Sequence, residues 1–424
     1  MPEQILDLHI HSKYSRACSK DLVLPTIAKT CETRGIDIVA TGDFTHPAWF
    51  ASMRESLEEA GPGIYWLKDG SSKTKFVIGT EVAVIKKHKD KTRRIHLLLF
   101  SPSLETTERF NKTLIARGFN LASDGRPILG LTCKELLTLM HETDPRMVMI
   151  PAHAWTPWFG ILGSKGGYDA LEEAFEELTP HIFSIETGLS SDPSMNWQVS
   201  SLDRITLISN SDAHSSAKLG REANVMQFPK EEDVTYDEIF RIIREGDKTQ
   251  FLKTIEFYPE EGKYHYDGHR DCGVVCHPDE TKKYGGLCPK CKRPLVIGVM
   301  NRVSALADRT EEEAKKHARI PYVSMVPLPE IIANVLHVGV NTKSVRNEYE
   351  RLIHALGTEF FILMDAPLAA IGEASSLEMA RGIERVRTGQ VFIRPGYDGE
   401  FGIVKVFEDG EPRGSARQLG FLDI

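Results

Sequence analysis

Short apolar runs alternate with amphipathic segments over about the first 240 residues of the chain. The apolar runs are typical of buried strands, and they read QILDLHIH, DIVATGD, KFVIGTEVAVI, RIHLLLF, VMIPAHA, IFSIETG and ITLISNSD. Helix signals lie between them: Gly35 follows LPTIAKTCETR as a C-terminal stop, and Thr132 with Glu135 forms a capping box before LLTLMH. This alternation predicts a mostly parallel sheet or a β/α barrel.

The pattern changes after about residue 240. Residues 241–305 are rich in histidine, tyrosine, lysine and cysteine, and helical patterns such as LPEIIANVL and SVRNEYERLIHAL follow. Strand-like pieces, QVFIRPGYDG and FGIVKVFED, come near the end. We therefore expect three domains: a β/α domain over 1–240, a small zinc-binding domain over 241–305, and a mainly helical region with short strands over 306–424.

Composition narrows the class of protein only a little. The chain has 424 residues, 26% of them charged, and a formal net charge of −8. That charge argues weakly against a nucleic-acid partner, although carboxylates that bind metal ions also contribute negative charge. The sequence has no run of 18 apolar residues, and MPEQILDLH lacks the features of a signal peptide. We therefore expect a cytoplasmic protein with no membrane partner.

The stretch ILDLHIHS places metal-capable side chains at every second position. In an extended strand these positions share one face, so Asp7, His9 and His11 point the same way. Polar groups on a buried face cost free energy unless they have partners. The stretch therefore predicts a metal site.

Similar side chains gather near the C-terminal ends of the other strands, where a β/α barrel carries its active site. We expect the metal ligands to be His9, His11, Asp21, Asp43, Glu81, His96, His153, Asp212 and His214. One zinc ion takes about four donors, so these side chains suit two to three divalent ions such as Zn, Mg or Mn. Closely spaced ions of this kind favour hydrolysis of a phosphate ester. We expect catalysis to depend on His9, His11, Asp43, Glu81, His153, Asp212 and His214.

Two of these ligands, and two further residues, have alternative interpretations. Asp21 is also suited to capping the helix that follows it. His46, three residues after Asp43, either supports a ligand or contacts phosphate. His96 begins its expected strand instead of ending it, and Glu186 in SIETG resembles Glu81 but is interpreted as structural.

The seven cysteines fall into two groups. Three are scattered, whereas Cys272, Cys276, Cys288 and Cys291 have the spacing C-x3-C-x11-C-x2-C. In a chain without a secretory signal this spacing predicts one structural zinc ion. Because C-x3-C is looser than the usual C-x2-C, His265, His269 or His277 is an alternative ligand to Cys276.

The motifs DLHIHS, TGDFTH, GTEV, PAHAW and SDAH, in this order, resemble those of the PHP (polymerase and histidinol phosphatase) domain. The resemblance covers about the first 240 residues. It implies a distorted (β/α)7 barrel with up to three metal ions. Many members have TDH where this chain has TGDFTH, so Asp43 would replace a histidine ligand.

The later motifs DGHRDCGV, CPKCKRPL, GVMNRVSALADR and RPGYDGEFG extend the resemblance to the endonuclease Q family over nearly the whole chain. It implies a DNA repair endonuclease that cuts the phosphodiester 5′ to uracil, hypoxanthine and xanthine, and at abasic sites. One alternative is a small-molecule phosphatase like histidinol phosphatase, which has no need of a zinc module. Another is a DNA-binding scaffold with a degenerate barrel, which does not explain the near-complete set of ligands.

An enzyme that inspects a base must extrude it from the stack, which calls for aromatic surfaces and positive charge. The loop AWTPWFGILGSKGGYD offers Trp155, Trp158 and Lys165, although it also suits a hydrophobic plug. Tyr397 in RPGYDGEFG is a candidate for the base pocket, or part of an ordinary turn. The C-terminal RQLGFLDI faintly resembles a tail that binds the sliding clamp, or is a packed or frayed terminus.

Overall fold

The computed structural model describes residues 3–89, 91–317, 320–408 and 410–411. It divides the chain into two compact units. The larger unit contains Met1–Val323 and Pro395–Gly402, and the smaller unit contains Ser324–Arg394 and Ile403–Ile424. The sequence RQLGFLDI lies outside the described residues, so its expected contact with a clamp stays a prediction. The expected division into three domains also stays a prediction.

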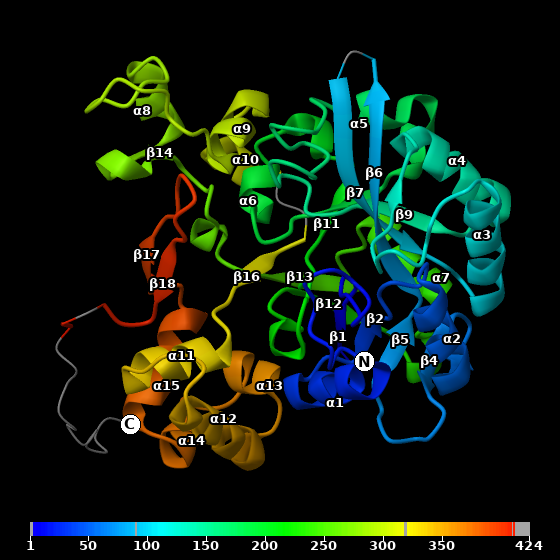
Figure 1. The fold of residues 1–424 in the computed structure, drawn as a ribbon. Coiled ribbons are helices and arrows are strands. Elements are labelled where there is room, and N and C mark those ends of the chain that lie inside the picture. The colour runs from blue at the N-terminus through cyan, green and yellow to red at the C-terminus, as the bar shows by residue number, and fades with distance from the viewer. Residues whose placement is uncertain (1–2, 90, 318–319, 409, 412–424) are drawn as a thin grey trace. The chain divides into compact units, whose positions relative to one another are not determined.

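An eight-stranded sheet forms one side of the larger unit (Figure 1). Its order is β16 (Tyr322–Ser324), β13 (Phe251–Glu256), β12 (Ala223–Gln227), β1 (Glu3–Asp7), β2 (Ile38–Ala40), β5 (Lys75–Val77), β4 (Ile64–Leu67) and β3 (Leu57–Gly61). Strands β1, β2 and β5 are parallel to one another. Strands β12 and β4 run antiparallel to their neighbours β1 and β5, so the sheet is mixed.

A second sheet has the order β8 (Ile128–Leu129), β6 (Gly79–His88), β7 (Lys91–Phe100) and β9 (Val148–Pro151). A parallel pair, β10 (Ser184–Glu186) and β11 (Thr206–Ile208), completes the main strands of the larger unit. The mixed α/β fold is confirmed, but the pairing is not mostly parallel. Strands β6 and β7 form a long hairpin, and so short a connection allows only antiparallel pairing. A closed barrel stays a prediction.

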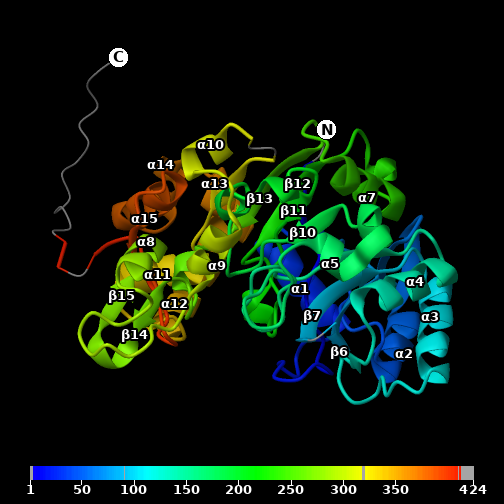
Figure 2. The ribbon, with the colours of Figure 1, turned by 90° about the horizontal axis from the view of Figure 1, so that it is seen from above.

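Two helices of the larger unit end or begin at the residues that the sequence predicted. Gly35 ends its helix in the left-handed conformation (φ 86°), and Thr132 and Glu135 form the expected capping box. Helices α3 and α4 lie side by side along the outside of β6, β7 and β9 (Figures 1 and 2). The helices are α1 (Leu24–Arg34), α2 (Pro47–Ser56), α3 (Leu104–Ala116), α4 (Cys133–Thr143), α5 (Leu171–Phe175), α6 (Pro193–Asn196) and α7 (Tyr236–Glu245).

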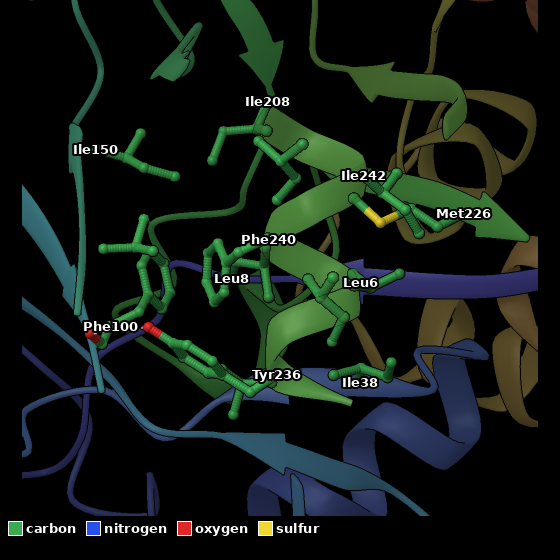
Figure 3. Packing of buried hydrophobic residues seen from close by; sticks show 14 of the residues in the cluster. Leu6, Leu8, Ile38, Phe100, Ile150, Ile208, Met226, Tyr236, Phe240 and Ile242 are labelled. Carbon is green, nitrogen blue, oxygen red and sulfur yellow. Dashed lines mark hydrogen bonds between the residues drawn. The ribbon is translucent and has the colours of Figure 1, made fainter. Parts of the chain in front are cut away.

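The main core packs α7 against the strands (Figure 3). Leu6 and Leu8 are buried in this cluster, so Asp7 and His9, on the alternate positions, lie on the opposite side of β1 and its extension. The Tyr236 hydroxyl donates a hydrogen bond to the carbonyl oxygen of Phe100 (3.2 Å), which ties α7 to β7. The core therefore fixes which face of the first strand carries polar groups.

The remaining elements are shorter. The larger unit continues with β14 (Asp267–His269), β15 (Val274–Cys276), α8 (Pro278–Lys283), α9 (Val299–Leu306) and α10 (Glu311–Lys315). The smaller unit contains α11 (Leu328–Leu336), α12 (Lys343–Leu356), α13 (Glu359–Met364), α14 (Leu368–Ala374), α15 (Leu377–Arg387), β17 (Phe392–Arg394) and β18 (Ile403–Lys405). Within the described residues, every helix is too short or too polar to cross a bilayer.

Candidate metal centre

Two groups of metal-capable side chains meet at Glu81. His9, His11, Glu81 and Asp212 each place one ligand atom within 4.8 Å of the others, and Glu81, His96 and His153 do the same. One Glu81 oxygen, Oε2, lies 3.3 Å from His11 Nε2 and 3.6 Å from His9 Nε2. The other, Oε1, lies 2.6 Å from His96 Nδ1 and 3.0 Å from His153 Nε2. Glu81 is therefore placed to bridge two cations.

Unpartnered buried atoms in these groups fit bound cations. His9 Nε2 is buried without a hydrogen-bond partner, 3.5 Å from Asp212 Oδ1. The nitrogen His153 Nδ1 is also buried and unpartnered. A buried polar atom without a partner costs free energy, and a divalent cation among nitrogen and carboxylate donors removes that cost.

A carboxylate lies behind His11. Asp43 Oδ1 is 3.1 Å from His11 Nδ1, and Asp43 Oδ2 accepts hydrogen bonds from the amide (2.7 Å) and hydroxyl (2.6 Å) of Ser12. The sequence predicts that Asp43 is a direct ligand. In the structure its oxygens face Ser12, Ser15 and His11, so it orients the His11 ring and leaves Nε2 toward Glu81 and Asp212.

A second carboxylate, Glu186, lies behind His9. Both its oxygens are 3.0 Å from His9 Nδ1, and it also accepts hydrogen bonds from the amide of His153 (2.7 Å) and the side chain of Asn210 (2.8 Å). From the sequence, Glu186 is interpreted as structural and is not included among the site residues. Its signal was the one that identified Glu81, a carboxylate at the end of an apolar strand.

The backbone is strained at this centre. Asp43, His153 and Asp212 have positive φ angles of 47°, 29° and 46°. Such conformations cost roughly 1–3 kcal/mol each in residues other than glycine and persist where the surrounding structure enforces them. Three of them around one cluster indicate a functional site.

The charges of the centre favour cations. Burial raises the pKa of Glu81, but His96 and His9 outweigh it and hold that pKa well below its usual value. Burial lowers the pKa of His9, but Glu186, Asp212 and Glu81 outweigh it and raise that pKa well above the ordinary value. Burial lowers the pKa of His96 to about 4, against the pull of Glu81, so this ring is neutral at neutral pH.

The other expected ligands lie differently. His214 is beside the centre: its Nδ1 is 2.9 Å from the carbonyl oxygen of Asp212, and its ring centroid is 4.6 Å from that of His11. Asp21 is exposed and accepts a hydrogen bond from Ser216 (3.1 Å), outside both ligand groups. His96 lies in the middle of β7 and not at its start, because that strand begins at Lys91. Its side chain still reaches Glu81 across the β6–β7 ladder.

Some of the expected substrate contacts are exposed and others are buried. Trp155 is fully buried and its indole N–H donates to Asn196 (2.7 Å), so it belongs to the core and has no surface to offer a base. Trp158 is 46% exposed and its ring lies 6.0 Å from that of Tyr264. Its neighbour Phe159 stacks on His96 with ring centroids 4.2 Å apart. Trp158 is therefore accessible and next in sequence to a residue that contacts His96, and Lys165 in the same loop is exposed.

Two other candidates have partners within the protein. His46 stacks on Tyr14 (4.2 Å between centroids) and is largely buried, with its Nδ1 unpartnered. The ring of Tyr397 lies so close to Gly268 that a Cβ there would be 2.3 Å from it. Tyr397 therefore packs against the β14–β15 hairpin.

The cysteine cluster includes a histidine. His269, Cys272, Cys288 and Cys291 place their ligand atoms within 4.8 Å of one another. Cys276 is not in this group of the described residues, and its side chain is buried beside Val274 and Leu295. In this group His269, one of the alternatives that the spacing left open, takes the place expected for Cys276, and a bound zinc ion stays a prediction.

Comparisons with known proteins cover both units. A family model, the MJ0043 C-terminal domain, matches residues 327–390. The uncharacterized protein MJ0043 of Methanocaldococcus jannaschii is 29% identical over 254 residues, which are 59% of this chain and 31% of that protein. The uncharacterized protein YqxK of Bacillus subtilis is 28% identical over 417 residues, 94% of this chain and 98% of that protein.

Two solved structures agree with the whole fold. The lesion-specific endonuclease PfuEndoQ from Pyrococcus furiosus has a TM-score of 0.82 and 31% identity over 95% of both chains. An endonuclease Q in complex with a 27-mer duplex carrying an abasic lesion has a TM-score of 0.81 and 31% identity, over 96% of this chain and 98% of that one. Because identity and fold agree over almost the full length, the chain belongs to the endonuclease Q family.

Proposed function

We propose that this protein is a metal-dependent DNA repair endonuclease that cuts the phosphodiester 5′ to deaminated bases and at abasic sites. The observation that carries the proposal is the pair of ligand groups sharing Glu81, in a chain that matches an endonuclease Q bound to abasic DNA over 96% of its length. A shared carboxylate suits the paired cations of phosphodiester hydrolysis.

The residues of the centre have distinct tasks in this proposal. His9, His11, Glu81 and Asp212 would hold one cation, and Glu81, His96 and His153 a second. Bound cations would supply a hydroxide nucleophile at neutral pH and neutralise the phosphate. Asp43 and Glu186 fix the ring orientation of His11 and His9. His214 points one nitrogen at the carbonyl oxygen of Asp212, which leaves Nε2 to accept a proton or a cation.

Lesion recognition is proposed to rest on hydrogen bonding. Uracil and hypoxanthine present a carbonyl where cytosine and adenine carry an amino group. A pocket that matches this carbonyl and the adjacent ring N–H would leave normal bases with unpaired groups, at about 1–3 kcal/mol per mismatch. Trp158, exposed and next in sequence to a residue that contacts His96, is the best-placed aromatic surface for an extruded nucleotide.

Cleavage of defined duplexes tests this function. Purified protein is incubated with end-labelled duplexes that carry one uracil, hypoxanthine, xanthine or abasic site, with an undamaged duplex as control. We expect cuts 5′ to each lesion, loss of cutting after chelation, and recovery when Zn, Mg or Mn is restored. His9→Ala and Asp212→Ala should abolish cutting while the protein stays folded. Cleavage of p-nitrophenyl phosphate but of no duplex would indicate a small-molecule phosphatase instead.

A further inference from the structure

Arg126 is a cation that reaches directly into the metal centre. Its Nη1 donates a hydrogen bond of 2.8 Å to Glu81 Oε2, the oxygen that also faces His9 and His11. Among the ion pairs of the described residues, no other arginine or lysine side chain pairs with a carboxylate of the two ligand groups. The Arg126 side chain is 22% exposed, whereas Glu81 is fully buried, so Arg126 is the solvent-accessible partner of this pair.

The loop that carries Arg126 is fixed from both sides. The Arg126 amide donates to Asp124 (3.0 Å), which also accepts from the amide of Arg16 (3.2 Å). Gly125 donates to the carbonyl of Tyr14 (3.0 Å), and a Cβ at Gly125 would lie 2.3 Å from Asp43 Oδ2. The loop therefore lies tightly against the residues that support His11.

This placement matches what phosphate hydrolysis needs beside its cations. A phosphodiester gains negative charge on its non-bridging oxygens as it is attacked, and donors fixed in advance stabilise that charge. A guanidinium has five N–H groups in a planar fork, and the bond to Glu81 uses one of them. The others are available to a group that approaches from solvent.

We propose that Arg126 binds the scissile phosphate and stabilises its charge during cleavage, with Glu81 holding the guanidinium in place. This inference rests on the proposed function. It assigns to Arg126 a contact with substrate, and it differs from the simpler role of a counter-ion that only neutralises Glu81. The two roles can be distinguished when cations are bound. Those cations already neutralise Glu81, so only the phosphate-binding role would then still require Arg126.

Phosphate binding distinguishes these roles without depending on turnover. Arg126→Gln, Arg126→Lys and wild-type protein are loaded with the same metal, and their metal content is measured by mass spectrometry. Titration calorimetry then gives the affinity of each for inorganic phosphate. Arg241→Gln, which removes a guanidinium that pairs with Glu238 on α7, is the matched control.

We expect Arg126→Gln to keep its metal, to bind phosphate at least tenfold more weakly, and to lose about 100- to 1,000-fold in kcat on abasic duplex. Arg126→Lys keeps the positive charge but not the planar fork of N–H groups. Compared with Arg126→Gln, it should recover part of the phosphate affinity and part of kcat. Arg241→Gln should match wild type. Unchanged phosphate affinity in Arg126→Gln, or loss of its metal, would overturn the proposal, because Arg126 would then only support Glu81.

The experiment separates this inference from the proposed function. If wild-type protein cuts none of the lesion duplexes, the proposed function fails. The phosphate titration still decides whether Arg126 binds phosphate at a metal-loaded centre.

Discussion

At the scale of single residues, two carboxylates set the ring orientation of two histidines in the candidate metal centre. Asp43 takes the Nδ1 side of His11, and Glu186 takes the Nδ1 side of His9. In both rings this leaves Nε2 facing Glu81 and Asp212. Such partners fix the tautomer and ring orientation of a histidine ligand and raise its basicity.

The variant Glu186→Gln tests whether the carboxylate behind His9 strengthens metal binding. The substitution keeps the size of the side chain but removes a carboxylate oxygen that accepts from both His9 and the amide of His153. We expect metal affinity to fall about 10- to 100-fold, as measured by competition with a chelator. Glu55→Gln, on the exposed face of α2, is the control. Equal metal affinity in Glu186→Gln and wild type would show that Glu186 does not tune the ligands.

The sequence predicted the residues whose positions follow from local patterns. It missed those whose positions depend on contacts between distant parts of the chain. His9 and His11 follow from strand periodicity, and Glu81 and Asp212 from their places near the ends of apolar runs; both signals are local in the sequence. Arg126 sits on a loop whose course depends on contacts with Tyr14 and Asp43, far away in the sequence. The supporting roles of Glu186 and Asp43 depend on which strands become neighbours.

At the scale of an element, the β14–β15 hairpin also places a residue that the sequence alone could not single out. The cysteine spacing alone left four candidates for the fourth zinc ligand. In the hairpin, Cys276 pairs with Asp267, and its side chain packs beside Val274 and Leu295. His269 stands at the other end of the ladder, opposite Val274, where it reaches Cys291 (3.9 Å). Strand register therefore places His269, and not Cys276, beside the other three cysteines, and the spacing of residues in the sequence does not reveal strand register.

Paired substitutions test that selection. We expect His269→Gln to lose about one zinc ion per chain or to bind it much more weakly, because zinc requires about four donors. Cys276→Ser should keep its zinc and lose only some stability, since it places a hydroxyl in an apolar cluster. Zinc content is measured by mass spectrometry after dialysis against a chelator. The reverse result, with zinc lost only from Cys276→Ser, would restore the four-cysteine set.

At the scale of the whole molecule, the larger unit holds fully buried carboxylates in its interior, among them Glu222 and Glu256. Glu256 accepts hydrogen bonds from Thr187 (2.9 Å) and Ser209 (3.1 Å) deep in the interior. Burial raises the pKa of Glu256 to about 8, and burial together with Glu256 raises the pKa of Glu222 well above its ordinary value. Both groups therefore favour their protonated forms in the folded protein.

This predicts that the larger unit loses stability as the pH rises. An unfolded glutamate titrates near pH 4.3, so the stabilisation is complete below that pH and is lost as pH rises through about 8. The loss is about 1.4 kcal/mol per pH unit for each proton that only the folded state holds. Glu256→Gln should flatten this dependence between pH 5 and 8, as measured by thermal unfolding of metal-free protein. Glu55→Gln should not, and an equally steep dependence in Glu256→Gln would contradict the prediction.

The chain passes from the larger unit to the smaller one and back again. This order affects how the two units can fold while the protein is being synthesised. Residues 395–402 belong to the larger unit, where Gly396 donates to Glu260 (2.7 Å) and Gly402 donates to Glu261 (3.0 Å). The ribosome makes all of 324–394, which belong to the smaller unit, before it reaches this segment. The smaller unit can thus begin to fold on the ribosome while the larger one is still incomplete. A truncated messenger that ends within 324–394 would therefore also remove the segment carrying Tyr397, which packs against the hairpin of His269.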